Sequence, residues 1–244
     1  MACVMKIEIT DSYEALSKAA AKKAANYINN NPGTLVCFAA GDTPLGTFKE
    51  LLLMQKEGNV DLSTVWYVGL DEWVGLGIDD KGSCIKVMHD SLYNYIPKER
   101  VRMFNGLADD IQKECSEIYE WIIKHGGIGL SLLGIGRNGH IGFNEPGTPD
   151  VEGCFTVELD EVTKSVSKKY FGKERAVTTG ITIGWRTLLD SQEVILLACG
   201  INKAQIVKKA IEEDCTPDVP ASMLQKHSTL TVILDKGAAS LLDQ

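Results

Sequence analysis

The stretch IGLSLLGIGRNGHIGFNEPG, residues 128–147, says most about the fold of this chain. Its first seven residues are apolar apart from Ser131, and they have the length of a β-strand that is buried on both faces. The glycines that follow permit sharp turns and a close approach of the backbone to a ligand. His140 and Glu145 stand in these turns, five residues apart. We therefore expect a buried strand that delivers an imidazole and a carboxylate to one end of a sheet.

The same alternation of apolar runs and helical segments recurs along the whole chain. Strands are predicted at 6–10, 34–40, 64–70, 128–134, 193–200 and 229–235. Helices are predicted at about 11–29, 45–56, 83–95, 109–124 and 202–214. This order predicts an α/β fold: a single-domain, doubly wound, mostly parallel and Rossmann-like sheet with helices on both faces. No linker or repeat interrupts it, so we expect residues 1–244 to form one domain.

One region departs from this alternation. Residues 154–159 predict a strand outside the main sheet, and residues 162–171 predict either a helix or a mobile flap. The following VTTGITIG, residues 177–184, has too many β-branched residues and glycines for a helix. We expect a mobile lid near 154–175.

Composition and charge exclude several classes of function. The 244 residues carry a net charge of −8, which opposes binding to nucleic acid. The seven cysteines show no C-x-x-C spacing, so we expect buried thiols in a reducing cytoplasm and no metal or other cofactor. No apolar run approaches the ~20 residues of a membrane span, and the N-terminus turns polar too early for a signal peptide. A homo-oligomer is compatible with the sequence, which fixes no oligomeric state.

Ligands of such sheets bind outside the carboxyl ends of the strands. The first turn there is AAGDTPLG, residues 39–46, in which Asp42 or Thr43 is expected to cap a helix with Pro44 at its first position. Free N–H groups at a helix start attract phosphate. An ordinary capped turn between strand and helix explains this stretch equally well.

The second turn, GLDEWVGL at residues 69–76, places Asp71 and Glu72 directly after a buried strand. Successive residues of an extended segment point in opposite directions, so one of the two carboxylates is expected to face the ligand. A helix cap or a pair of surface carboxylates is the alternative.

In the third turn, a carboxylate at Glu145 can hold the His140 imidazole as one tautomer for general acid–base catalysis. The glycines from Gly134 to Gly139 also match the G-x-G-x-x-G spacing of dinucleotide-binding proteins. A helix does not obviously follow them, however, and the stretch lies in the middle of the chain. We therefore reject nucleotide binding.

The phrases GLDEWVGL and LGIGRNGHIGFNEPG together resemble the glucosamine-6-phosphate deaminase/isomerase family. The resemblance extends over most of the chain through FAAGDTPLGTFKE, TLLDSQEVILLACGINKAQ and PASMLQKHSTLTVILD. It implies a parallel α/β fold and the conversion of glucosamine 6-phosphate, or its galacto epimer, to a ketose 6-phosphate and ammonia. The implied partner is a small-molecule sugar phosphate, and no cofactor is implied.

The resemblance also implies roles for individual residues. Asp71 occupies the position of the base that moves a proton between C2 and C1 of the opened sugar. His140 matches the imidazole that opens the pyranose ring, Glu145 matches its carboxylate partner, and Asn138 stands beside them.

The resemblance implies a phosphate site as well. Gly41, Asp42 and Thr43 fall on the loop that holds the 6-phosphate, and Lys203 matches a lysine that reaches it. Lys169 falls where many members carry a phosphate-binding arginine in a mobile lid. Further residues of the turns are expected to contact the substrate: Ala40, Glu72, Gly136, Arg137 and Gly139.

Three departures from the family pattern matter. Asn138 replaces an aspartate that many members have, so His140 and Glu145 are expected to carry more of the acid–base work. Lys169 gives up the bidentate grip of arginine on phosphate, and Asp42 replaces a small neutral residue.

Two alternative functions remain open at this point. One is a 6-phosphogluconolactonase of the same fold, although these enzymes usually have Asp-Glu-Arg where this chain has Asp71-Glu72-Trp73. The other is a non-catalytic sensor of sugar phosphates.

Overall fold

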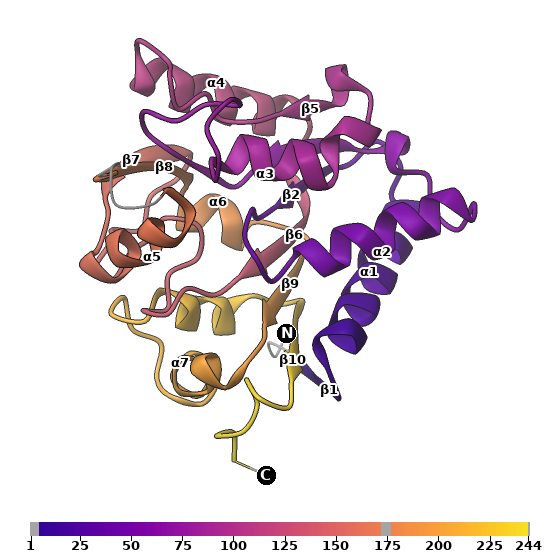
Figure 1. The fold of residues 1–244 in the computed structure, drawn as a ribbon, viewed down its shortest axis with the longest axis vertical. Helices are drawn as coiled ribbons and strands as arrows, with labels where there is room; N and C mark the ends of the chain where they lie inside the picture. Colours follow the sequence, from indigo (N-terminus) through magenta and orange to yellow (C-terminus); the bar gives the residue numbers. More distant parts are fainter. Residues whose placement is uncertain (1–4, 172–176, 244) are drawn as a thin grey trace.

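The computed structural model describes residues 5–171 and 177–243. A seven-stranded parallel sheet forms its centre (Figure 1), in the order β1-β10-β9-β6-β2-β3-β5. The strands are β1 Lys6–Thr10, β2 Leu35–Phe38, β3 Trp66–Gly69, β5 Val101–Arg102, β6 Ile128–Gly134, β9 Glu193–Ala198 and β10 Leu230–Asp235. The predicted parallel α/β fold is thus confirmed. The two-residue edge strand β5, which is too short to give a periodic signal, was not predicted.

Helices cover both faces of this sheet, as predicted. Side chains of α1 Tyr13–Asn30, α2 Leu45–Lys56 and α3 Cys84–Ser91 share one apolar core with the sheet, and α1 and α2 lie side by side (Figure 1). Side chains of α4 Ile111–Lys124, α6 Trp185–Leu189 and α7 Ala204–Glu212 share the other. Among the described residues, no helix is long and apolar enough to cross a membrane.

The alternation of side chains along β2 shows why its four residues are all buried. Leu35 and Cys37 belong to the core under α4 and α7, whereas Val36 and Phe38 belong to the core under α1 and α2. A strand covered on both faces needs apolar side chains at every position, because each face meets a layer of helices. The continuous apolar runs of the sequence are the result.

A second, antiparallel sheet lies beyond the carboxyl end of β3. It consists of β4 Asp71–Trp73, β8 Thr179–Ile183 and β7 Cys154–Glu158, in the order β4-β8-β7. The strand predicted outside the main sheet is confirmed as β7. The segment that follows, for which either a helix or a flap was predicted, forms helix α5, Glu161–Phe171.

Some predicted bounds are wrong for local reasons. The helix expected at 83–95 begins at Cys84, capped by Ser83, but ends at Ser91 because Leu92 leaves the helical region at φ −149°. A 3₁₀ turn, Tyr93–Tyr95, follows it. Further 3₁₀ turns lie at Leu62–Thr64, Lys98–Arg100, Ile201–Lys203 and Pro220–Lys226.

The core under α1 and α2 yields a stability prediction. The Phe38 ring is fully buried and lies 5.7 Å from the Phe48 ring and 5.8 Å from the Tyr67 ring. Phe38→Ala should lower the free energy of unfolding by about 3–5 kcal/mol, because it leaves a cavity between these rings. Leu53→Ala, at a side chain that is 44% exposed, should change it by less than about 1 kcal/mol in the same urea titration. Equal effects of the two substitutions would contradict the close packing of the Phe38 ring against Phe48 and Tyr67.

Candidate active site

The turns after β2, β3, β6 and β9 meet at one cavity. These strands are neighbours in the order β9-β6-β2-β3, so their carboxyl ends lie side by side at the middle of the sheet. The chain winds away from β2 toward β3 and away from β6 toward β9, which makes this the switch point where such sheets bind ligands. The cavity has a volume of about 280 Å³, and Asp71, His140 and Lys203 all line it.

Asp71, the first residue of β4, supplies the buried carboxylate of the cavity. Its side chain is 7% exposed, and its Oδ1 atom has no hydrogen-bond partner within the described part of the chain. A buried carboxylate oxygen without a partner is costly in a folded protein. Because Asp71 lines the cavity, its carboxylate is suited to accept a proton or a hydrogen bond from a ligand.

Glu72 points the other way, as the alternation of an extended segment requires. Its Oε1 atom accepts hydrogen bonds from the N–H groups of Trp73, at 2.8 Å, and Cys84, at 2.9 Å. Its Oε2 atom accepts one from the N–H of Ile85 at 2.7 Å. Glu72 therefore holds the first turn of α3, and it is not among the residues that line the cavity. The structure gives it a structural role in place of the expected contact with substrate.

The two adjacent carboxyl groups both have raised pKa values. Burial, together with the charge of Glu72, raises the pKa of Asp71 from 3.8 to about 7, and the Cys84 thiol offsets part of this rise. Burial raises the pKa of Glu72 to about 7, although the hydrogen bonds from the three N–H groups favour its ionised form and lower the pKa in part. Those donors keep the charge of the pair on Glu72, so Asp71 is the member that gains and loses its proton near neutral pH.

The glycines after β6 shape the loop that carries His140. The N–H of Gly136 donates to the His140 carbonyl at 2.8 Å, and a Cβ atom on Gly136 would lie 2.3 Å from the imidazole. Only glycine leaves room for the ring at this position. Gly139, at φ +88°, faces Ile206 and Val219 instead of the cavity, so its part is to turn the backbone.

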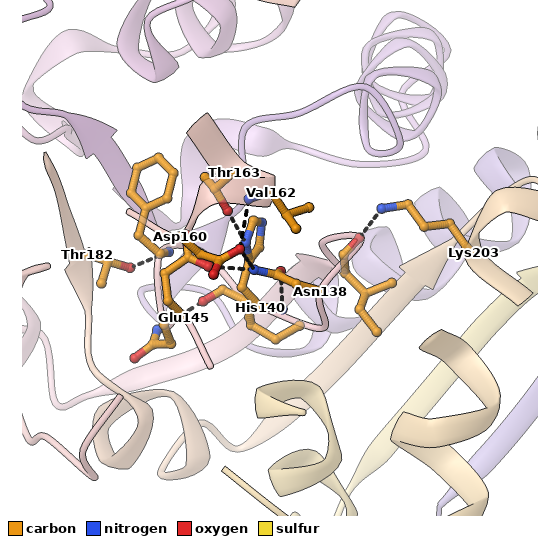
Figure 2. A network of polar contacts seen from close by, with 12 residues as sticks. Asn138, His140, Glu145, Asp160, Val162, Thr163, Thr182 and Lys203 are labelled. Atoms are coloured by element: carbon orange, nitrogen blue, oxygen red, sulfur yellow. Dashed lines mark hydrogen bonds and ion pairs between the residues drawn. The ribbon is translucent and has the colours of Figure 1, made fainter. Parts of the chain in front are cut away.

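The His140 imidazole is held on its Nδ1 side by a polar network (Figure 2). Nδ1 lies 3.2 Å from Oε2 of Glu145 and 3.0 Å from Oγ1 of Thr163. The Asn138 amide donates to the same Glu145 oxygen at 2.8 Å, and its own oxygen accepts from the His140 N–H at 3.2 Å. These contacts fix the ring and leave Nε2 available for a ligand, as a general acid–base group requires.

Glu145 lies behind His140 and does not line the cavity. It is 3% exposed, so burial acts to raise its pKa, but hydrogen bonds from His140, Thr163 and Asn138 outweigh burial and the net pKa is lowered. Glu145 is therefore an ionised partner for the imidazole and acts on a ligand through the ring.

Lys203 supplies positive charge to the cavity and lies apart from the His140 network (Figure 2). Its Nζ atom donates to the Ile135 carbonyl at 2.6 Å. Burial and the neighbouring Arg137 lower the pKa of Lys203 to about 8, while Asp42 acts in the opposite direction. Ala40, Gly41, Asp42, Thr43, Gly136 and Arg137 line the cavity as well.

The turn after β2 differs in one detail from the prediction. Pro44 is the N-cap of α2 and its own side chain makes no capping hydrogen bond, so the expected cap by Asp42 or Thr43 is wrong. The Tyr13 hydroxyl of α1 caps the helix instead. It accepts a hydrogen bond from the Gly46 N–H at 2.8 Å and lies 3.1 Å from the carbonyl oxygens of Asp42 and Thr43. Tyr13 lies some 30 residues before the turn, which is why no local pattern indicates it.

Helix α5 forms a wall of the cavity through Val162, Thr163, Val166 and Tyr170. The sequence did not single out Thr163, since a threonine within a helix carries no signal of function. Lys169 lies in the same helix, and its side chain is outside the described residues. Residues 172–175 of the expected lid also lie outside the described residues. The movement of this lid stays a prediction.

An α/β sheet that places a buried carboxylate of raised pKa, a fixed imidazole and positive charge around one cavity is a site suited to acid–base chemistry on a small anionic ligand. Residues 9–233 match the family model described as glucosamine-6-phosphate isomerases/6-phosphogluconolactonase, and the chain belongs to this family.

Several known proteins are similar to this chain in sequence or structure over nearly its full length. The glucosamine-6-phosphate deaminase of Alkaliphilus oremlandii is 42% identical over 241 residues, which cover 98% of this chain and 100% of the relative. The solved structure of a monomeric glucosamine-6-phosphate deaminase superposes with a TM-score of 0.93 at 37% identity, covering 97% of this chain and all of that one. The 6-phosphogluconolactonase of Thermotoga maritima, with a TM-score of 0.77 at 18% identity over 96% of this chain and 100% of its own, shares the fold alone.

The raised pKa of Asp71 yields a prediction on stability against pH. The unfolded carboxyl group ionises near pH 3.8 and the folded one near pH 7. Between these values the folded protein holds a proton that the unfolded chain has lost. The stability that this proton contributes therefore falls as the pH rises through the window and is absent above about pH 7. Asp71→Asn should raise the free energy of unfolding at pH 8 by on the order of 2 kcal/mol and change it little at pH 4.

Urea titrations at pH 4, 5, 6, 7 and 8 measure this effect. The gain from Asp71→Asn should grow steadily up to pH 7, whereas Asp79→Asn, at an exposed carboxylate of the same region, should show no such trend. A gain that does not depend on pH would show that Asp71 is not protonated in the folded protein.

Proposed function

We propose that this chain is an amino-sugar-6-phosphate deaminase/isomerase, which converts glucosamine 6-phosphate to a ketose 6-phosphate and ammonia. The observation that carries the proposal is that the Asp71 carboxylate and the His140 imidazole line one cavity together with Lys203. A proton acceptor, an acid–base group and an anion site are the parts that this reaction needs. The names of the relatives, at 37% and 42% identity, support the same substrate.

The first step would be the binding and opening of the sugar. Lys203, Arg137 and the turn at Gly41–Thr43 hold the 6-phosphate, which fixes the distance of the sugar carbons from the opposite end of the cavity. Nε2 of His140 passes the ring proton, taking it from the C1 hydroxyl and returning it to the ring oxygen. Ionised Glu145 stabilises the imidazolium that forms in between.

The second step would be isomerisation on the open chain. The Asp71 carboxylate removes the C2 proton to give an enolamine and returns that proton to C1. A group whose pKa is about 7 is suited to both halves of this transfer, because it gains and loses a proton with equal ease near neutral pH. Water then attacks the imine at C2 and ammonia leaves, which yields the ketose 6-phosphate.

Several parts of the proposal rest on the sequence. We propose residues 1–244 as one catalytic domain and a small-molecule sugar phosphate as its partner. The six described cysteines are free thiols, which supports a reducing cytoplasmic location. Assembly into a homo-oligomer, the exclusion of nucleic acid and the independence from any cofactor stay predictions.

A panel of three substrates tests the proposed function. Purified protein is incubated with glucosamine 6-phosphate, galactosamine 6-phosphate or 6-phosphogluconolactone, and ammonia, ketose phosphate and lactone hydrolysis are assayed. Ammonia and ketose phosphate in equal amounts are expected from glucosamine 6-phosphate, and the galacto arm measures the preference at C4. Lactone hydrolysis without ammonia release would replace the proposal with the lactonase alternative.

Asp71→Asn should abolish ammonia release and leave binding of the sugar phosphate in place. The amide has nearly the same size but cannot accept the C2 proton, so the loss in kcat should be at least about a hundredfold. Calorimetry with glucosamine 6-phosphate checks that binding persists. Asp79→Asn serves as the control with unchanged turnover, and substantial turnover by Asp71→Asn would remove Asp71 from the mechanism.

Lys203→Met should raise KM and affect kcat less, because it removes the positive charge that faces the phosphate. A hydrogen bond to a charged group contributes about 1.5–3 kcal/mol, so KM should rise roughly tenfold to a hundredfold. The lowered Lys203 pKa of about 8 also predicts that the KM of the unmodified protein rises above pH 8, where the free amine forms. Lys49→Met, on the exposed side of α2, is the control; an unchanged KM in Lys203→Met would place the phosphate elsewhere.

A further inference from the structure

Asp160 is a half-buried carboxylate next to the active site for which the proposed mechanism has no role. It stands directly before α5, and its Oδ1 atom accepts the N–H of Val162 at 2.9 Å, as a helix-capping residue does. The same oxygen lies 3.2 Å from Nδ2 of Asn138. One carboxylate oxygen therefore joins the start of α5 to the loop that carries His140 (Figure 2).

The Asn138 amide lies between two carboxylates. Its two N–H groups are directed to Glu145 Oε2, at 2.8 Å, and to Asp160 Oδ1, at 3.2 Å, and its oxygen accepts the His140 N–H. Every polar atom of this amide is thus in use. A carboxylate at position 138 could not donate a hydrogen bond to Glu145 or to Asp160. It would also place a third negative charge in contact with these two.

Helix α5 also reaches the imidazole itself. Thr163 lies three residues after Asp160, and its hydroxyl is 3.0 Å from Nδ1 of His140. Because Asp160 caps the first turn of the helix, it fixes where this hydroxyl stands. The ring is therefore bounded on its Nδ1 side by two residues, Glu145 and Thr163, both of which are held in place by contacts that lead to Asp160.

We infer that Asp160 is a positioning residue for the His140–Glu145 pair, acting through the Asn138 amide, and that position 138 must be an amide because Asp160 is an acid. This inference deepens the proposed function, on which it rests for the role of His140. The geometry of the network itself is independent of which substrate the cavity takes.

The charge around the ring makes the inference measurable. On the Nδ1 side, the ring faces Glu145 from its own loop, with Asp160 behind the Asn138 amide. The cavity is also lined by the thiol of Cys84, the phenol of Tyr170 and four charged residues: Asp71 of β4, Asp42 of the turn after β2, Arg137, and Lys203 before α7. Substitutions at 138 and 160 leave all of these lining residues unchanged, so a change in the protonation of His140 reports the Asn138–Asp160 contact.

The test is an NMR titration of the His140 imidazole in the full chain, with the signal assigned by comparison with His140→Gln. Asp160→Asn keeps a good helix cap and removes one negative charge, so the midpoint should fall by roughly half a pH unit. Asn138→Asp adds a negative charge and should raise it by at least as much. The double variant Asn138→Asp/Asp160→Asn restores a donor opposite an acceptor, and its midpoint should return toward the unmodified value.

Asp110→Asn is the matched control. Asp110 caps α4 through the Lys113 N–H at 3.0 Å, and it does not line the cavity, so the His140 midpoint should not change. Equal midpoints in Asp160→Asn and Asp110→Asn would overturn the inference. The titration needs no turnover: a protein that releases no ammonia would reject the proposed function while the midpoints still decide the role of Asp160.

Kinetics give a second measurement where ammonia release is observed. Asp160→Ala removes both the cap and the acceptor and should lower kcat about tenfold with little change in KM, since it misplaces the ring and not the phosphate site. Asp160→Asn should recover part of that loss. An effect confined to KM would assign Asp160 to substrate binding and contradict a positioning role.

Discussion

The site depends on the three backbone N–H groups that hold the Glu72 carboxylate. They fix Glu72 at the start of α3, and in an extended strand this directs its neighbour Asp71 to the opposite side, into the cavity. The same contact keeps a negative charge beside Asp71 in a buried place, and burial with that charge raises the Asp71 pKa to about 7. One interaction thus sets both the direction and the acidity of the proposed base, although Glu72 itself does not line the cavity.

The acid–base group on the opposite side is placed by different means. Gly136 leaves the space that the imidazole occupies, and the polar network behind the ring fixes its orientation. Asn144 ties the loop to the small sheet, since its amide donates to the carbonyls of Ile141 and Ile183 at 2.9 Å each. The small sheet therefore holds both residues of the proposed acid–base pair: β4 carries Asp71, and β8 anchors the loop of His140.

Local patterns in the sequence predict the main sheet well. The apolar run at 128–134 matches β6, and the segment 45–56 matches α2. A strand buried on two faces requires a continuous apolar run, and a helix with one buried face requires apolar residues at helical spacing, so both are visible in the sequence. Strand β4 leaves none, since its pairing with β8 joins Asp71 to Thr182 over more than a hundred residues. The structural role of Glu72 also depends on a contact twelve residues away. The contact between Asp160 and the Asn138 amide spans 22 residues, so no local pattern connects Asp160 to His140.

The charges of the cavity set a narrow range of pH for the free protein. Asp71 is ionised above about pH 7, and Lys203 is protonated below about pH 8, so both have the state that the proposed reaction needs only between these values. A bound phosphate favours the protonated lysine and raises its pKa, which widens the range on the alkaline side. Under the proposed function the substrate would thereby strengthen its own binding site, and a chain with a net charge of −8 could hold an anion through a few buried groups. The acid limit stays with Asp71, whose pKa is set chiefly by burial and by Glu72; Lys203 is not among the groups that shift it.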